Sequence, residues 1–276
     1  MATEVTFRFP PVVETILSMQ FGRLPGLTNG HLGGFWGQRK AEWPSVSDAP
    51  LLDETFETFG DEPGWSRAFR LRLTQDPSGR VQMRNKAGDR MIQVQNCRLD
   101  YNWIAQPDQA YPRYRTVRPE FDAVLREFRG FVKEHCSGEP IPNQWEVTYV
   151  NHMPKGTVWR ELEDVGTVFP SLLGCGGRQQ GIGFEGFHAQ WRFEIVPRRG
   201  RLHVAIQHAY VGTQQKKEAI VMMLTARGPV EKEGDELVAL DRGLNLGHDL
   251  IVTSFVGFTS EEARAYWNRE KSNANE

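Results

Sequence analysis

The sequence predicts an α+β protein in which one curved antiparallel sheet carries its helices on a single face. Stretches of alternating apolar and polar residues indicate half-buried strands, and stretches with apolar residues three and four positions apart indicate amphipathic helices. The two kinds of segment occur twice in the order β-α-β-β-β-α, at an offset of about 130 residues. We therefore expect a duplicated chain, with residues 1–138 and 139–276 as half-repeats of one integrated domain.

The composition is that of a globular protein with a substantial core. The chain has 276 residues, 39% of them hydrophobic, which is close to the length at which a single core stops growing. A net charge of -2 leaves nucleic acid open as a partner but does not favour it. No apolar run approaches the roughly 18 residues of a membrane span, and no secretory signal pattern opens the chain. We expect a cytoplasmic protein without a membrane partner.

In the first half, strands are expected where apolar and polar residues alternate. Two prolines at the start of the first strand fit there because they cannot donate ladder hydrogen bonds. In the last strand, Ile92 and Val94 differ in parity from Leu99 and Tyr101, so a bulge near Asn96 is needed to turn both pairs toward the core. The expected strands cover residues 9–21, 68–75, 80–85 and 91–104.

Two helices and one irregular segment complete this half. Residues 27–43 place apolar side chains on one helical face, and their glycines would let the helix approach the sheet closely. Residues 44–64 are rich in Pro, Ser, Asp and Glu and are expected to be irregular. Residues 117–135 form a long amphipathic segment with Pro119 in its first turn. We expect this helix to lie across the buried face of the sheet.

The second half repeats the order. Trp145, Val147 and Tyr149 mark a strand, and Thr259 with Glu262 forms a capping-box pattern for a last helix that extends to Trp267. The other expected segments are a short helix at 165–173, strands at 187–196, 201–211 and 219–226, and a helix at 248–258.

Known catalytic and metal-binding patterns give no assignment. The three cysteines are widely spaced without a C-x-x-C pair, and His203 and His208 point to opposite faces of one strand. The glycine-rich residues 174–183 follow a helix rather than a strand and lack the Gly-Lys-Ser/Thr ending of a phosphate loop. We expect no catalytic residue, no metal and no cofactor, and we consider an enzyme less expected than a binding protein.

Polar side chains gather on the face of the expected sheet opposite the helices. An antiparallel sheet ordinarily has one solvated face, but this one is rich in Arg and Gln, which also fits a docking platform for a protein or a nucleic acid. The side chains expected there are Arg70, Arg72, Gln82, Arg84, Gln93, Gln95, Gln190, Arg192, Glu194, His203 and Gln207.

The connection between the last strand and the long helix is a second candidate surface. Tyr101-Asn102-Trp103 and Tyr111-Pro112-Arg113-Tyr114 place polar-tipped aromatics and an arginine around it. Loops on a rigid scaffold often carry binding sites, although Tyr and Trp also pack with their polar tips satisfied. Asn102, Arg113 and Asn151 are the candidate binding residues of this region.

Six short motifs carry a resemblance at family level. They are Pro10-Pro11-Val12-Val13-Glu14, Phe35-Trp36, Tyr101-Asn102-Trp103, Tyr111-Pro112-Arg113-Tyr114, Tyr149-Val150-Asn151, and His248-Asp249 ahead of Trp267. With these motifs the chain resembles a sporadically distributed, uncharacterised bacterial family of about this length. The resemblance implies a mobile accessory gene, such as one in a defence or toxin-antitoxin locus, and it carries no catalytic or cofactor assignment. The element order also resembles the saddle of the TATA-box-binding protein and, more loosely, helix-grip folds, an analogy of topology only.

Two functional hypotheses follow. In the first, the chain is a non-enzymatic accessory or regulatory protein that recognises another macromolecule, preferably a protein, through the polar sheet face. In the second, it is a small-ligand carrier or an enzyme with a pocket between sheet and helices, suggested by aromatics such as Trp36, Trp103 and Trp191. The sequence leaves the identity of the partner and the oligomeric state open.

Overall fold

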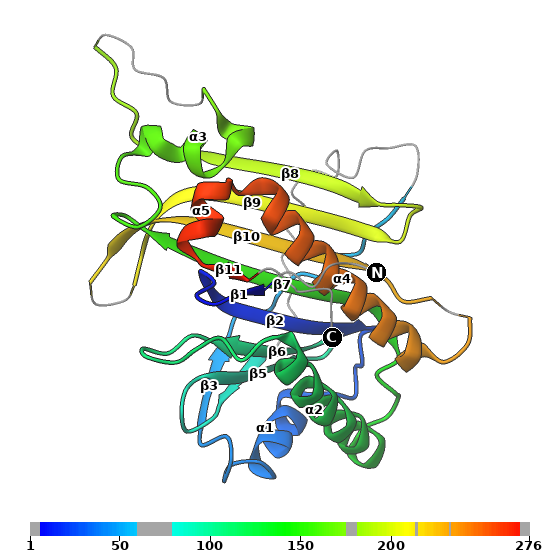
Figure 1. Cartoon of the computed structure of the whole chain (residues 1–276). Helices are drawn as coiled ribbons and strands as arrows, with labels where there is room; N and C mark the ends of the chain where they lie inside the picture. Colours follow the sequence, from blue (N-terminus) through cyan, green and yellow to red (C-terminus); the bar gives the residue numbers. More distant parts are fainter. Residues whose placement is uncertain (1–5, 60–78, 175–180, 213–214, 232, 271–276) are drawn as a thin grey trace, which may run out of the picture.

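The computed structural model describes residues 6–59, 79–174, 181–212, 215–231 and 233–270. Within them, nine strands form one curved antiparallel sheet on which helices pack, so the predicted α+β class is confirmed (Figure 1). Across the sheet the strands are β3 (Ser45–Ala49), β4 (Arg80–Arg84), β5 (Arg90–Gln95), β6 (Arg98–Ile104), β2 (Val12–Phe21), β7 (Pro142–Pro154), β10 (Lys217–Pro229), β9 (Gly200–Val211) and β8 (His188–Ile195).

The strand order is the same on both sides of the central β2–β7 pair. Going outward, one side continues with β6, β5 and β4, and the other with β10, β9 and β8; β3 is an additional outer strand on the first side. A helix follows β6 and another follows β10, and both lie on the same side of the sheet (Figure 1). This order is what the predicted duplication expects, although the duplication itself stays a prediction. The predicted strand at 68–75 lies outside the described residues.

The two long helices begin earlier than periodicity suggested, whereas the helix predicted at 27–43 covers only Asn29–Gly37. α2 (Tyr114–His135) starts three residues before the predicted segment, so Pro119 lies in its second turn rather than its first. α4 (Glu236–Phe258) starts at Glu236 instead of at residue 248. Its N-terminus is capped by Asp235, whose carboxylate accepts hydrogen bonds from two main-chain amides. The other helices are α1 (Asn29–Gly37), α3 (Val165–Val168), α5 (Glu261–Tyr266) and the 3-10 turns Leu162–Asp164 and Pro170–Leu172.

Three local predictions were wrong. Residues 45–49 of the segment expected to be irregular form β3, which pairs with β4. The expected single strand 91–104 is the hairpin β5–β6, because Asn96 and Cys97 form a turn rather than a bulge; chain reversal, not an inserted residue, brings both apolar sets to one face. The last helix is capped by Ser260, which accepts a hydrogen bond from the amide of Ala263. Thr259 instead ends α4 and donates its hydroxyl to the Phe255 carbonyl at 2.7 Å.

The closest approach between helix and sheet is made by α4, not by the glycine-rich α1. A Cβ atom at Gly243 would lie 2.2 Å from the Trp145 ring, and one at Gly247 would lie 2.9 Å from the same ring. In α1, by contrast, Cβ atoms at Gly33 and Gly37 would meet nothing within 4 Å. The large ring of Trp145 therefore fits under α4 only because two glycines, one helical turn apart, face it.

The two ends of the described chain lie together. β1 (Thr6–Phe7) pairs antiparallel with β11 (Arg269–Glu270), and Phe7 packs edge-on against Phe255 at 5.5 Å between ring centroids. No helix in the described residues is both long and apolar enough to span a membrane.

Candidate functional site

The polar side chains of the central strands lie on the sheet face away from the helices. In β7, Trp145, Val147 and Tyr149 point toward the helices, so Gln144 and Glu146 point to the opposite face. The polar residues of this face are nevertheless buried: Ser18, Gln20, Gln93, Gln95, Arg98, Asp100, Asn102, Gln144, Glu146, Thr148 and Thr225. A solvated face would leave such side chains exposed, so part of this face is covered.

Residues 50–59, here called the strap, provide cover over the central strands. Two glutamines hold the strap by its main chain. The Leu52 amide donates to Gln95 Oε1 at 3.0 Å while Gln95 Nε2 donates to the Leu52 carbonyl at 2.9 Å. Gln144 Oε1 accepts from the Glu57 amide at 3.0 Å, and its Nε2 donates to the Thr55 carbonyl. These contacts recognise an extended backbone rather than particular side chains.

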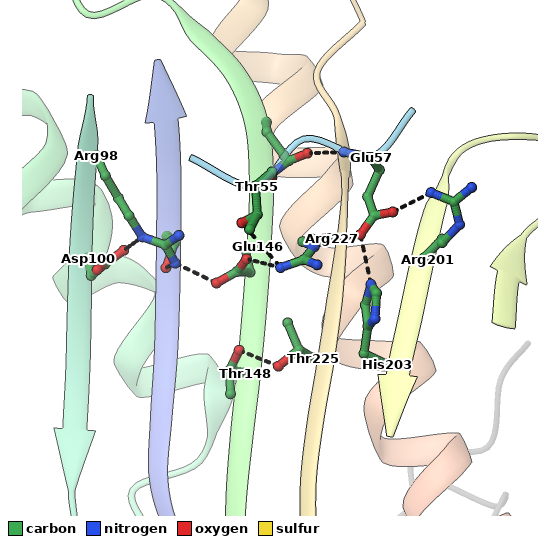
Figure 2. A network of polar contacts seen from close by, with 12 residues as sticks. Thr55, Glu57, Arg98, Asp100, Glu146, Thr148, Arg201, His203, Thr225 and Arg227 are labelled. Atoms are coloured by element: carbon green, nitrogen blue, oxygen red, sulfur yellow. Dashed lines mark hydrogen bonds and ion pairs between the residues drawn. The ribbon is translucent and has the colours of Figure 1, made fainter. Parts of the chain in front are cut away.

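One strap side chain enters a pocket of cations. The carboxylate of Glu57 meets Arg227 Nε at 2.6 Å, His203 Nε2 at 2.7 Å and a guanidinium nitrogen of Arg201 (Figure 2). Only 5% of the Glu57 side chain is exposed. Burial by itself raises the pKa of Glu57, but the hydrogen bonds from His203, Arg227 and Arg201 outweigh it and lower the pKa to about 2. Glu57 is therefore bound as a carboxylate.

An ion chain connects this pocket to the other side of the sheet centre. Arg227 lies 3.4 Å from Glu146, which pairs with Arg98, and Arg98 meets Asp100 at 2.6 Å (Figure 2). Burial opposes the charge on Arg98, but Asp100 and Glu146 raise its pKa above the ordinary value. In this network the sheet supplies three guanidinium groups, of Arg98, Arg201 and Arg227, and two carboxylates. The strap supplies the third carboxylate, so the sheet alone is cationic here.

Gln20 offers a hydrogen-bond donor that the strap leaves unused. Cross-strand pairing places Gln20 between Arg98 of β6 and Gln144 of β7, in the row of side chains that also holds Gln95. Its side chain is 2% exposed, and its amide nitrogen has no acceptor in the part of the chain that the structure describes. A buried unpaired amide is costly. We call Gln20, Gln95, Gln144, Arg201, His203 and Arg227 the cradle.

The strap buries no apolar side chain. Leu51, Leu52 and Phe59 are half-buried, and Phe56 is 47% exposed. Polar contacts therefore provide most of its attachment, without the apolar burial that fixes a core segment.

Other predicted residues of the polar face lie elsewhere on it. Gln82 donates to Gln93, Gln93 to Asn102, and Asn102 to the Glu14 carboxylate, at 2.9, 2.9 and 2.6 Å. Burial raises the pKa of Glu14, and the charge of the nearby half-buried Arg84 partly offsets this. The side chains of this ladder form hydrogen bonds with one another, and the ladder lies to one side of the cradle.

Of the remaining predicted binding residues, none joins the cradle. Arg192 on β8 is exposed and Gln207 on β9 is half-buried. Asn151 faces the helices, where it donates to the Met222 carbonyl at 3.3 Å. Arg70 and Arg72 lie outside the described residues. Among the residues predicted for the polar face, Gln95 and His203 belong to the cradle.

The aromatic region around Tyr111 is a packed seam between the two halves of the sheet. Tyr111 donates to Tyr149 at 3.0 Å, Tyr149 lies 2.8 Å from His248 Nδ1, and His248 stacks on Tyr114 at 4.0 Å between ring centroids. Burial raises the pKa of both Tyr111 and Tyr149. Arg113 precedes α2 with φ 74° and ψ 155°, a strained conformation for a residue with a Cβ. Asn102, Arg113 and Asn151 do not meet in one site.

Sequence reasoning missed most of the cradle. Gln20, Gln144 and Arg227 follow from the same alternation that identified their strands, since their parity is opposite to that of Met19, Trp145 and Ala226. Glu57 had no such signal, because it lies in an irregular segment 144 residues from Arg201.

An open groove of about 600 Å³ lies between the end of β8 and α4. Its lining is mostly apolar and includes Phe193, Leu202, Leu250 and Phe258. Within the described residues, no cluster of three or more His, Cys, Asp or Glu side chains could hold a metal ion.

Comparison with known proteins gave no match: no family model, no curated protein and no solved structure is significantly similar to this chain.

Proposed function

We propose that this chain is a non-enzymatic protein-binding protein, an accessory or regulatory subunit whose cradle binds an extended acidic segment of a partner. One observation carries the proposal: the cradle already holds an extended acidic segment, the strap, through its main chain and one carboxylate. The strap is then the resident occupant, which the partner segment displaces.

The chemistry of the cradle favours a polypeptide over a nucleic acid. The amides of Gln95 and Gln144 each pair with one main-chain N–H and one C=O, and a sugar-phosphate backbone offers no such N–H. Asp100 and Glu146 lie in the same ion network and repel phosphates. The net charge of -2 points the same way.

Displacement is reasonable on energetic grounds. A competing segment with one carboxylate can reproduce the main-chain contacts with Gln95 and Gln144 and the carboxylate contacts of Glu57, and it can also accept a hydrogen bond from Gln20. It does not have to extract an apolar side chain from the core, because the strap buries none. The defence or toxin-antitoxin locus that the family resemblance implies would supply such a partner. The alternative, a small apolar ligand in the groove beside β8, has only the groove itself in its favour.

A direct test replaces residues 51–58 by a Gly-Ser linker of equal length and adds a fluorescent peptide with the sequence of residues 50–59. We expect anisotropy to report saturable binding to the folded variant and weaker binding to the intact protein, where the strap competes. A peptide carrying Glu57→Gln should bind at least about tenfold more weakly, because it loses the charge-assisted hydrogen bonds.

The control is a peptide carrying Glu54→Gln, since Glu54 pairs with Arg23 outside the cradle. It should bind as the native peptide does. If the folded variant fails to bind the native peptide, or binds both altered peptides equally, the cradle does not recognise an acidic segment.

A further inference from the structure

β8 and β3 are the two outer strands of the described sheet, and they differ in form. β3 has five residues, of which Ser45, Val46, Ser47 and Asp48 are exposed. β8 has eight residues with the sequence HAQWRFEI, including the exposed Phe193. Short polar edges resist pairing with other chains, whereas long edges with apolar residues favour it.

The main-chain groups of β8 that face away from β9 can be identified from the pairing. The His208 amide donates to the Phe187 carbonyl at 3.0 Å, and these residues are opposite each other in the antiparallel register. Odd-numbered residues of β8 therefore direct their N–H and C=O groups toward β9. Gln190, Arg192 and Glu194 direct theirs outward, where β8 has no neighbouring strand among the described residues.

The side chains on this edge are self-complementary in charge. Arg192 and Glu194 share the polar face of β8 and are both exposed. Arg192 has no partner among the described residues, and Glu194 accepts a hydrogen bond from the Arg198 amide through Oε1. If two β8 strands pair antiparallel about a twofold axis at Phe193, Arg192 of each copy lies opposite Glu194 of the other.

Neighbouring registers lack this match. In an antiparallel pair, side chains that lie opposite each other point to the same face of the sheet. A twofold axis perpendicular to the sheet must therefore lie between the two copies of one β8 residue. An axis at Arg192 or at Glu194 places like charges opposite each other, which is destabilising. An axis at Trp191 places Arg192 opposite Gln190. Only the axis at Phe193 gives two cross-strand ion pairs.

We infer that a second copy of this chain pairs with β8, so that the protein forms a twofold dimer with one continuous sheet. Arg192 and Glu194 set the register by their ion pairs and contribute the outward main-chain hydrogen bonds. On the helix side, Phe193 faces its own copy, and Trp191 faces Ile195 of the other chain. Phe193 is 42% exposed in the single chain and becomes covered. This surface is separate from the cradle, so either proposal can fail without the other.

Sedimentation velocity of the intact protein over about a hundredfold range of concentration tests the dimer. We expect a dimer that Arg192→Glu converts to a monomer, because it places two pairs of glutamates opposite each other. The double variant Arg192→Glu/Glu194→Arg should restore the dimer by exchanging the charges. Arg242→Glu, an exposed site on α4, is the charge-matched control and should stay dimeric. A cooperative melting transition would show that each variant is folded.

The register is tested by oxidation of single-cysteine substitutions. Phe193→Cys should form a disulfide-linked dimer, because residues at a non-hydrogen-bonded position on the axis have Cα atoms about 4.5 Å apart, within disulfide range. Trp191→Cys should not, and the native chain is the background control. A monomeric native protein, failure of the double variant to restore the dimer, or cross-linking at residue 191 instead of 193 would each overturn the inference.

Discussion

The two faces of β7 are closed in different ways. Toward the helices, Trp145 lies under Gly243 and Gly247 of α4, in contacts that leave no room for a Cβ. Toward the other face, Gln144 and Glu146 meet the strap and the arginines through hydrogen bonds and ion pairs alone. One strand thus has a side fixed by close packing and a side held by hydrogen bonds and ion pairs. On the proposed function, the buried polar face is the one that exchanges its occupant.

Separating the two halves of the chain should have the largest effect, because it disrupts both faces of the sheet. Residues 1–138 and 139–276 expressed apart lose the β2–β7 pairing, which exposes a strand edge and the apolar seam of both fragments. We expect aggregation or no expression of either fragment, with partial rescue on co-expression. Two soluble fragments that each melt cooperatively would mean two independent domains.

Gly243→Ala should produce the next largest effect, because it disturbs the packed face alone. The added Cβ would lie 2.2 Å from the Trp145 ring, so the helix or the ring must move. We expect a loss of about 3 kcal/mol or more in urea unfolding. Gly257→Ala in the same helix is the control: its Cβ meets nothing, and alanine favours helix by up to about 1 kcal/mol. Equal effects would contradict the close-packing account.

Glu57→Gln should disturb only the polar face. Arg227 keeps Glu146 as a partner, so we expect a loss of about 1 kcal/mol or less in global unfolding. The strap, however, should become sensitive to limited proteolysis, because the charged contacts that hold it are lost. Glu54→Gln should leave the proteolysis rate of the strap unchanged. A globally destabilised Glu57→Gln with a protected strap would show that the strap is part of the core.

The effect of pH is confined to the acid range. The pKa of Glu57 falls from an ordinary value of 4.5 to about 2 in the cradle, so its contribution to strap binding is complete above pH 4.5. It is lost progressively as the pH falls from 4.5 toward 2. The affinity of the native peptide for the strap-replaced variant should therefore decrease in this range, relative to the Glu57→Gln peptide. Parallel pH curves for the two peptides would contradict this assignment.

Local sequence patterns predicted the elements that are marked by alternation or by helical spacing of nearby residues. Alternation located β4, β8, β9 and β10, because each strand has one apolar side. Alternation gave the wrong result at Asn96 and Cys97. A tight turn and a bulge both change which alternate residues face the core, so the pattern does not distinguish them. It also missed the first turns of α4, where Gly243 and Gly247 face the sheet and weaken the apolar stripe that marks a helix.

The cradle is formed by residues that lie far apart in sequence, so no local sequence pattern predicts it. Its glutamines come from β2, β5 and β7, and its cations from β9 and β10. The polar face was predicted, but as a solvated or docking surface, because nothing near Glu57 in sequence indicates that the strap returns to Arg201 and Arg227. Long-range pairing, rather than propensity, decides which polar residues are buried.

Amide hydrogen exchange in the intact protein measures whether the strap opens independently of the sheet. The Leu52 and Glu57 amides donate to Gln95 and Gln144, and the Val147 and Tyr149 amides belong to the centre of the sheet. We expect the strap amides to exchange through a local opening, at a free energy well below that of global unfolding, while the β7 amides exchange only with global unfolding. If strap and β7 amides open at the same free energy, the strap is a fixed part of the fold and the cradle is not an exchangeable site.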